Sequence, residues 1–156
     1  MKKTNAARIL DGLKIPYELR EYEVDENDLS AINVANKLSL PADQVFKTLV
    51  LQGDKTGIVV ACIPGDSELD LKALAVISGN KKTEMVNIKD LLQLTGYIRG
   101  GCSPIGLKKA YPVYLHESAK DFPFICISAG IRGCQVLIAA DDVVKGVKAH
   151  YCSIIH

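Results

Sequence analysis

One segment, QVFKTLVLQGDKTGIVVACIP at residues 44–64, constrains the fold more than any other. Its two apolar runs, residues 45–52 and 58–64, have the length and residue types of strands, and the linker GDKTG is rich in turn-forming residues. The pattern therefore predicts a hairpin. Lys47 lies near the start of the first strand. Burying an ammonium group there is costly unless the group reaches water or an anionic partner.

Further strands and helices are predicted on both sides of this hairpin. Strands are expected at residues 17–22, 111–117, 122–128 and 134–140, with a short extended piece at 81–86. Helices are expected at residues 5–13 after the cap Thr4, at about 31–38, within 67–79 with Gly79 as its stop, from the cap Asn87 to about 95, and after Asp141. Several strands follow one another through turns, which favours a mixed sheet over a doubly wound parallel one. The expected fold is α+β in a single domain, residues 1–156.

Composition excludes several classes of protein. Hydrophobic residues make up 48% and charged residues 24% of the 156 residues, as in a globular protein. No apolar stretch is long enough to span a bilayer, and Asp11 interrupts the N-terminal segment before a signal-peptide core forms. We therefore expect a cytoplasmic protein that is not bound to a membrane. The net charge of +1 does not by itself indicate a nucleic-acid binder. The lysine pairs at 2–3, 81–82 and 108–109 are most simply interpreted as solvated surface residues.

The cysteines and histidines do not form a metal-binding pattern. The five cysteines are widely spaced without a C-x-x-C pair, and the three histidines lack the spacing of metal ligands. Most of the thiols lie in apolar runs, where reduced cysteine acts as a small core residue. We expect no disulfide framework, no metal and no cofactor.

Three glycine-containing loops are candidates for ligand binding. GDKTG lacks the G-x-x-x-x-G-K-[ST] spacing of a phosphate loop and is followed by a strand, so that interpretation fails. The segment TGYIRGGCSPIGLKK, residues 95–109, could present backbone amides to an oxyanion or a phosphate, or it could be an irregular crossover. The turn ISAGIRGCQ, residues 127–135, reads as a plain turn between strands that could place the Ser128 hydroxyl beside a ligand. Cys102, the one thiol expected to be reachable, has no histidine nearby in sequence to activate it.

Five motifs in order, DQVFKTLVL, LDLKAL, GNKKTEM, TGYIRGGCSPIG and SAGIRG, resemble the YbaK/EbsC family of aminoacyl-tRNA deacylases over nearly the whole chain. The resemblance implies a mixed sheet curled into a partial barrel with helices around it. It also implies a relationship to the editing domain of bacterial prolyl-tRNA synthetases.

The resemblance assigns roles to particular residues. It implies that Lys47 lines the substrate pocket, that the Gly100 amide faces the scissile carbonyl with Gly101 beside it, and that Tyr22 and Ser128 belong to the pocket. Two positions depart from the pattern, because Ser30 stands where some members have an aromatic residue and Gln135 stands where cysteine-specific members have an aspartate. Both of these are expected at the amino-acid end of the pocket.

The implied function is trans-editing, the hydrolysis of a wrong amino acid from tRNA, with cysteine on tRNA(Pro) as the expected substrate. A prolyl pocket cannot reject cysteine or alanine by size alone, so a second site must remove the error. Two alternatives stay open: deacylation of alanine or another small residue through an activated water, and a non-catalytic binding or regulatory module. The expected partners are the acceptor end of tRNA(Pro) and prolyl-tRNA synthetase.

Overall fold

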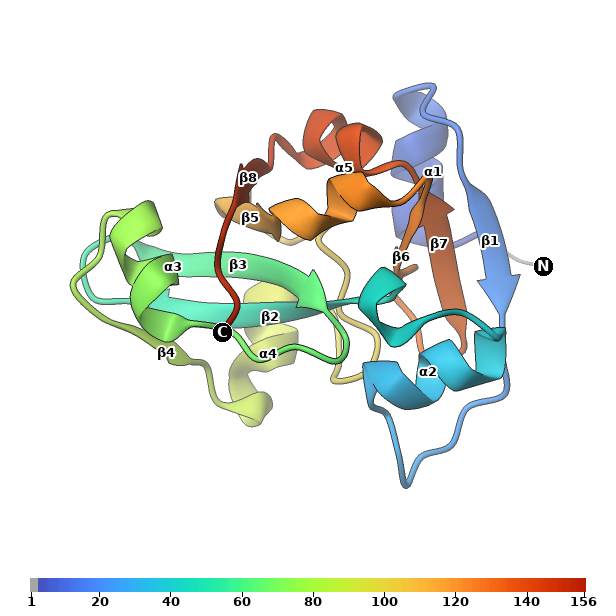
Figure 1. Ribbon diagram of the computed structural model, residues 1–156, viewed down its shortest axis with the longest axis horizontal. Coiled ribbons are helices and arrows are strands. Elements are labelled where there is room, and N and C mark those ends of the chain that lie inside the picture. The colour runs from blue at the N-terminus through green and yellow to red at the C-terminus, as the bar shows by residue number, and fades with distance from the viewer. Residues whose placement is uncertain (1–2) are drawn as a thin grey trace.

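A computed structural model describes residues 3–156 (Figure 1). Its elements follow one another as α1 (Asn5–Gly12), β1 (Glu18–Glu21), α2 (Ala31–Leu38), the 3₁₀ helix η1 (Ala42–Gln44), β2 (Phe46–Gly53), β3 (Gly57–Pro64), α3 (Leu71–Ser78), β4 (Thr83–Met85), α4 (Ile88–Thr95), β5 (Val113–His116), the 3₁₀ helix η2 (Glu117–Asp121), β6 (Ile125–Ser128), β7 (Cys134–Ile138), α5 (Ala140–Val147) and β8 (His150–Cys152). Helices alternate with strands that pair in both senses, so the predicted α+β class is confirmed.

The strands form two sheets that meet at one point. The five-stranded sheet has the order β4-β2-β3-β5-β8 and mixes antiparallel with parallel pairs, whereas the three-stranded sheet β1-β7-β6 is antiparallel. A parallel bridge between Val45 and Cys126 joins them just before β2 begins. The two sheets therefore continue into each other without closing, and the predicted partial barrel takes this open form.

The main core lies between the two sheets. Phe46 and Val50 of β2 pack in one buried cluster with Ile125 and Ile127 of β6 and Val136 of β7. A second cluster covers the opposite face of the five-stranded sheet beneath α3, and a third lies between α2 and the three-stranded sheet. Since each sheet buries side chains on both faces, alternate residues of β2 and β6 face different clusters.

The helix ends follow the expected capping chemistry. The Thr4 hydroxyl accepts a hydrogen bond from the Ala7 amide at 3.2 Å, as predicted for the start of α1. Asn87 caps α4 through its side-chain oxygen, and Gly79 ends α3 with a φ of 81°, a conformation that glycine adopts without strain.

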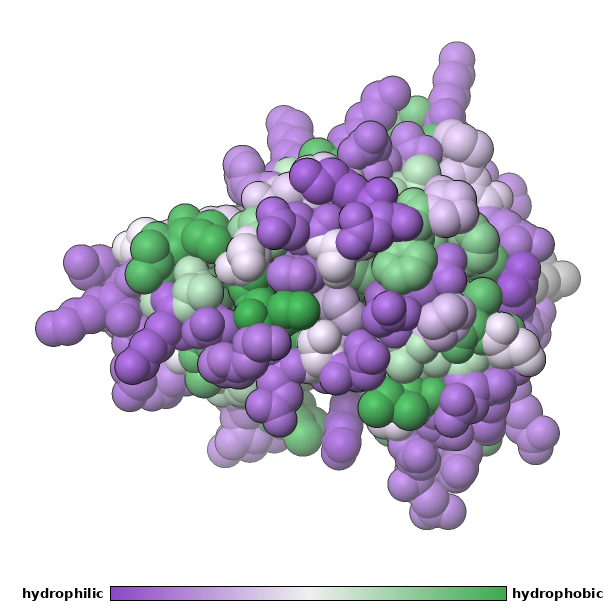
Figure 2. All heavy atoms as spheres, in the orientation of Figure 1, coloured by the Kyte–Doolittle hydropathy of each residue, from purple (hydrophilic) through white to green (hydrophobic). Residues whose placement is uncertain are grey.

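The surface over α3 is unusually apolar. Leu74 and Ala75 are buried on one side of this helix, while Val76 is 79% exposed on the other, and Figure 2 shows hydrophobic residues gathered there. The sequence LKALAVIS is apolar nearly all round, yet the structure buries only one side of it. Among residues 3–156, no helix has both the length and the apolar character needed to cross a membrane.

Stability should fall as the pH drops below about 6.5 because of His116. This histidine, at the end of β5, is buried, and its Nδ1 accepts a hydrogen bond from the Ile154 amide at 3.2 Å. Burial lowers the pKa of His116 below its ordinary value, although nearby Glu117 and Asp121 act in the opposite direction. The unfolded chain therefore binds a proton at higher pH than the folded chain, so the stabilisation is complete above the unfolded pKa of about 6.5 and is lost below it.

Urea unfolding at pH 7.5 and pH 5.5 tests this expectation. Protonating Nδ1 removes the acceptor for the Ile154 amide, a loss of about 1 kcal/mol or more. His116→Asn keeps an acceptor without a titratable group, so it should flatten the pH dependence between these values. The matched change His150→Gln, at an exposed histidine, should leave the dependence as it is in the unsubstituted protein. An equal dependence in His116→Asn would exclude His116 as its source.

Candidate active site

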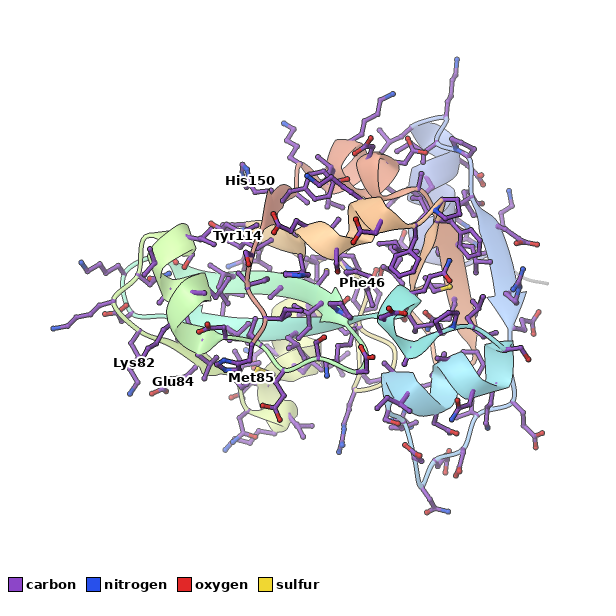
Figure 3. All side chains as sticks on the ribbon, in the orientation of Figure 1. Phe46, Lys82, Glu84, Met85, Tyr114 and His150 are labelled. Atoms are coloured by element: carbon purple, nitrogen blue, oxygen red, sulfur yellow. The ribbon has the colours of Figure 1, made fainter. Side chains whose placement is uncertain are left out.

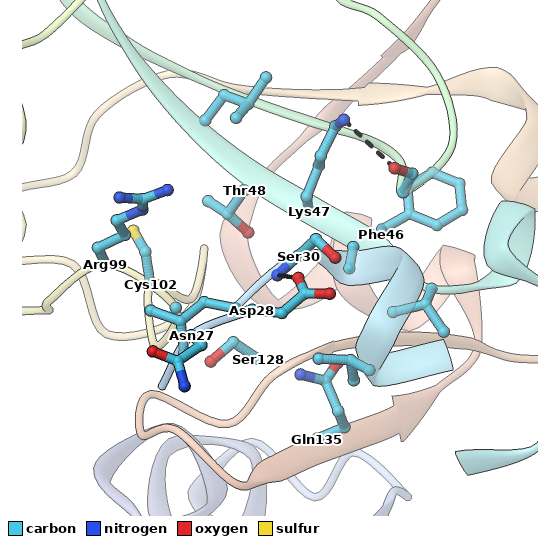
Figure 4. A pocket seen from close by; sticks show the side chains of 17 residues that line it. Asn27, Asp28, Ser30, Phe46, Lys47, Thr48, Arg99, Cys102, Ser128 and Gln135 are labelled. Carbon is cyan, nitrogen blue, oxygen red and sulfur yellow. Dashed lines mark hydrogen bonds between the residues drawn. The ribbon is translucent and has the colours of Figure 1, made fainter. Parts of the chain in front are cut away.

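A cavity of about 460 Å³ opens where the two sheets meet (Figure 4). The segment leading into α2, the start of β2, the loop between α4 and β5, and the facing ends of β6 and β7 all contribute to its walls. The polar side chains and the glycine that concern its chemistry are Asn27, Asp28, Ser30, Lys47, Thr48, Arg99, Gly100, Cys102, Ser128 and Gln135. Of the seven residues that the family resemblance singles out, five lie here: Ser30, Lys47, Gly100, Ser128 and Gln135.

Strand register explains why Lys47, Ser128 and Gln135 are brought together. Ser128 and Gln135 stand directly opposite each other across the antiparallel pair β6-β7. The parallel bridge from Val45 to Cys126 places Val45 and Cys126 on the same face, and Lys47 and Ser128 each follow by two residues. Because side chains alternate along strands, all three polar residues belong to one continuous face.

The Lys47 ammonium is only loosely held. The side chain is half-buried, and its Nζ donates to the Gly65 carbonyl at 3.3 Å, longer than a typical hydrogen bond (Figure 4). None of the ion pairs formed within residues 3–156 involves Lys47. Lys47, near the start of the strand, therefore brings to the cavity wall a positive charge that forms no ion pair within the described chain.

Gln135 brings an unused hydrogen-bond acceptor to the same wall. The residue is 5% exposed, and its Oε1 has no partner within the described part of the chain. The neighbouring Ser128 hydroxyl is 3.1 Å from the Gly130 amide and accepts a hydrogen bond from it. A buried acceptor without a donor costs about 1–3 kcal/mol, so a ligand that displaces the groups covering this oxygen and donates a hydrogen bond to it is favoured.

The segment before α2 supplies the carboxylate of the cavity. Ser30 is the N-cap of α2, and its hydroxyl accepts from the Asn33 amide at 3.2 Å. The Ser30 amide in turn donates to Asp28 Oδ1 at 3.1 Å, and hydrogen bonds from Ser30 hold the pKa of Asp28 below its ordinary value. Asp28 therefore stays ionised and is a weak proton acceptor. It was not predicted from the sequence, although its position two residues before a helix-capping serine is a recognisable turn signal.

The glycine-rich loop contributes Gly100 but not Gly101 to the cavity. Gly100 has a φ of 83° and lies next to Leu29 and Arg132. The Arg132 Nε donates a hydrogen bond to the Arg99 carbonyl at 2.9 Å. The Gly100 amide forms no hydrogen bond within residues 3–156. The Gly101 amide, by contrast, donates to the Ile98 carbonyl at 2.9 Å, and this residue lies outside the cavity lining. The pairing of Gly101 with Gly100 as a second oxyanion donor is therefore corrected, because a turn already uses that amide.

Two other glycines in these loops serve packing around Tyr97. A Cβ atom at Gly106 would lie 2.7 Å from the Tyr97 hydroxyl, and one at Gly130 would lie 2.8 Å from the tyrosine ring. The buried Tyr97 hydroxyl also donates to the Ile105 carbonyl. Tyr97 thus packs against both glycine-rich turns, and this contact explains glycines that the sequence alone left open to a ligand-binding interpretation.

Tyr22 is not brought to the cavity. The residue lies just after β1, where its amide donates to the Gly133 carbonyl at 3.0 Å. It is half-buried and packs against the cluster between α2 and the three-stranded sheet. The structure therefore gives Tyr22 a packing role next to α2, and the expectation that it lines the substrate pocket is not met by this geometry.

Cys102→Ala should leave any deacylation within about twofold of the unsubstituted rate. No disulfide joins the cysteines of residues 3–156, and of the five only Cys102 is partly exposed, as predicted. Burial nevertheless raises the pKa of this thiol to about 11, so almost none of it is the reactive thiolate near neutral pH. Release of the amino acid from charged tRNA measures the effect. A loss of about a thousandfold would instead indicate covalent catalysis by this thiol.

Within residues 3–156, no group of three or more His, Cys, Asp and Glu side chains is placed to hold a metal ion. The cavity lining itself contains one carboxylate and no histidine. The chemistry available there consists of a lysine ammonium, an exposed arginine, the Asp28 carboxylate, the Cys102 thiol, hydroxyl and amide groups, and a backbone amide at Gly100 without a partner in the described chain.

Comparison with known protein families identifies the class of protein. Residues 26–145 match the family described as the aminoacyl-tRNA editing domain, and the chain belongs to this family. The matched region includes all the polar residues of the cavity.

Individual relatives agree with this class. The chain is 50% identical over 153 residues, covering 98% of this chain and 93% of the relative, to an Enterococcus faecalis protein named "Putative Cys-tRNA(Pro)/Cys-tRNA(Cys) deacylase EbsC". It is 29% identical over 108 residues to a proline–tRNA ligase of Thermosipho africanus, a match that covers 62% of this chain but 19% of the ligase. A solved structure described as "a putative trans-editing enzyme for prolyl tRNA synthetase" shares the fold, with a TM-score of 0.83, 20% identity and 99% coverage of both chains.

Proposed function

We propose that this chain is an aminoacyl-tRNA deacylase that removes cysteine mischarged onto tRNA(Pro). The observation that carries the proposal is the content of the cavity. Lys47, Gly100 and Gln135 line a space of about 460 Å³, a typical volume for a small-ligand site, and Gln135 Oε1 has no hydrogen-bond partner within the described chain. The cavity belongs to an editing-family chain that is half identical to a relative named for Cys-tRNA deacylation.

The cavity contains no activated nucleophile, which favours attack by the substrate itself. Histidine is absent from its lining, Cys102 is held as a thiol, and Asp28 is a weak base. The sulfur of the esterified cysteine bonds to its own carbonyl carbon, the bond from that carbon to the ribose oxygen breaks, and the thiol proton passes to the ribose oxygen. Water then opens the released cyclic thiolactone to give free cysteine.

The residues of the cavity position this reaction. The Lys47 ammonium leaves the Gly65 carbonyl to bind the ribose or phosphate oxygens of the terminal adenosine. The unused Gly100 amide donates to the carbonyl oxygen as negative charge develops on it. Gln135 Oε1 accepts a hydrogen bond from the ammonium or thiol of the amino acid, which Ser128 and the ionised Asp28 help to orient.

The test is to mix purified protein with Cys-tRNA(Pro) and follow the release of free cysteine, with Pro-tRNA(Pro) as the control. Cysteine should be released well above the spontaneous rate, and proline should not. Faster release of alanine from Ala-tRNA(Pro) would assign the site to another small residue. Tight binding of charged tRNA without release would instead identify a binding module.

Selection of tRNA(Pro) is proposed to come from prolyl-tRNA synthetase. The net charge of +1 gives little general attraction to a polyanion, so recognition of the whole tRNA by this chain alone should be weak. The isolated protein should release cysteine from tRNA(Pro) and tRNA(Cys) at rates within a few fold of each other. Adding the synthetase should favour tRNA(Pro). Strong discrimination by the isolated protein would contradict this partnership.

A further inference from the structure

The lysine pair at 108–109 differs from the other lysine pairs of the sequence. Lys3 forms an ion pair with Asp11 and Lys82 forms one with Glu84, each at 2.6 Å, and Figure 3 labels Lys82 and Glu84 at the start of β4. Lys2 lies outside the described residues. Neither Lys108 nor Lys109 takes part in an ion pair within residues 3–156, although both are exposed. Their charges are therefore available to an external partner.

These two lysines line a second hollow together with a third. The hollow, of about 570 Å³, lies between residues 104–113 and the end of α5 with the start of β8, and Lys148 and His150 complete its polar lining. Lys148 is exposed and also forms no ion pair in the described chain. None of the described Asp or Glu residues lines the hollow, so three lysines line it without a carboxylate among them. His150 stacks near Tyr114, with ring centroids 5.8 Å apart, on the outer strand β8 (Figure 3).

The hollow lies close to the candidate active site along the chain. Cys102 lines the active-site cavity and Pro104 lines the basic hollow, so their Cα atoms are at most about 7 Å apart. The residue between them, Ser103, is fully buried, which fixes this short segment as a shared wall. The cavity and the hollow therefore lie next to this one buried segment.

We infer that the basic hollow formed by Lys108, Lys109 and Lys148 binds phosphate groups of the RNA backbone next to the 3′ end that enters the active-site cavity. The inference rests on the proposed deacylase function for the identity of the RNA. Exposed, flexible ammonium groups in an open hollow suit a phosphate backbone, which they contact as point charges without reading sequence. This surface also explains how a chain with a net charge of only +1 holds tRNA at all, because its uncompensated positive charge is locally concentrated.

The test compares two triple variants of equal charge. Lys108→Gln/Lys109→Gln/Lys148→Gln removes the hollow's charges, and Lys55→Gln/Lys72→Gln/Lys89→Gln removes three exposed lysines that line neither the hollow nor the cavity. Binding of uncharged tRNA is measured against salt concentration. The first variant should bind about tenfold or more weakly, and its plot of log affinity against log salt should be shallower by about 2–3, since each phosphate contact contributes about 0.7–0.9. In the control variant, the decrease in log affinity and the change in salt slope should each be at most about half of those in the first variant. Both variants should unfold at the same urea concentration as the unsubstituted protein.

A short substrate separates this surface from the catalytic site. Cysteine esterified to adenosine carries no backbone phosphate, so the hollow-lysine variant should hydrolyse it at the unsubstituted rate while showing a raised KM for full-length Cys-tRNA(Pro). Equal losses in the two triple variants, or an unchanged affinity for tRNA, would overturn the inference. A loss of binding to prolyl-tRNA synthetase with tRNA binding intact would also overturn it, in favour of a protein partner. If tRNA binding depends on these lysines but no ester is cleaved, the proposed deacylase function fails while the RNA surface stands.

Discussion

Lys47→Ala should lower the rate of cysteine release from Cys-tRNA(Pro) by about 100-fold or more, the amount that a well-placed polar contact in the transition state supplies. The expectation follows from the position of the ammonium, which is half-buried on the cavity wall and held only by a 3.3 Å hydrogen bond to the Gly65 carbonyl. No carboxylate within the described chain pairs with it, so the fold loses little when it is removed. The midpoint of urea unfolding should therefore stay close to that of the unsubstituted protein.

Two further variants sharpen this test. Lys47→Arg keeps the charge, but its planar guanidinium suits a different geometry, so it should also be badly impaired. Lys37→Ala is the matched control, because Lys37 also donates to a backbone carbonyl, that of Glu23, yet does not line the cavity. Its activity should be nearly unchanged. Unfolding of Lys47→Ala, or full activity in it, would show that the lysine is structural.

Local patterns in the sequence predict much of this fold. The hairpin of β2 and β3 has the predicted strands almost to the residue, with Gly53 opposite Gly57 at its turn. Thr4, Asn87 and Gly79 act as the predicted helix boundaries because caps satisfy backbone groups within a few residues. The strand β8 was missed, since it is three residues long and pairs in parallel with β5 far away in the sequence.

The site was predicted less fully, for the same reason. Lys47, Ser128 and Gln135 come together through the bridge from Val45 to Cys126, a contact that no local periodicity encodes, and their assignment depended on resemblance to a family. Asp28 was overlooked because a carboxylate before a helix cap reads as turn chemistry.

Glycines were the least predictable feature. Gly100 lines the cavity, whereas a Cβ atom at Gly101 would lie 3.2 Å from the backbone of Ile131 and Arg132, and one at Gly106 would lie 2.7 Å from the Tyr97 hydroxyl. All three have the same signature in the sequence, and only the packing around them separates a ligand-facing glycine from a structural one.

Serine esterified to tRNA(Pro) should be released at least about 100-fold more slowly than cysteine. The two amino acids have nearly the same shape, so the cavity should bind both esters, but they differ as internal nucleophiles. A thiol with a pKa of about 8.5 is a few per cent thiolate at pH 7, whereas a hydroxyl is essentially never ionised there. The protein cannot compensate for this difference, because the cavity lining has no histidine, the Cys102 thiol has a pKa raised to about 11, and the pKa of Asp28 is lowered.

Rates are measured at saturating protein from pH 6 to pH 8, and the rate of cysteine release should rise with pH towards the pKa of the substrate thiol. Release of serine or alanine at a rate similar to that of cysteine, with no such rise, would mean that a bound water attacks the ester, and the substrate-assisted mechanism would then be wrong.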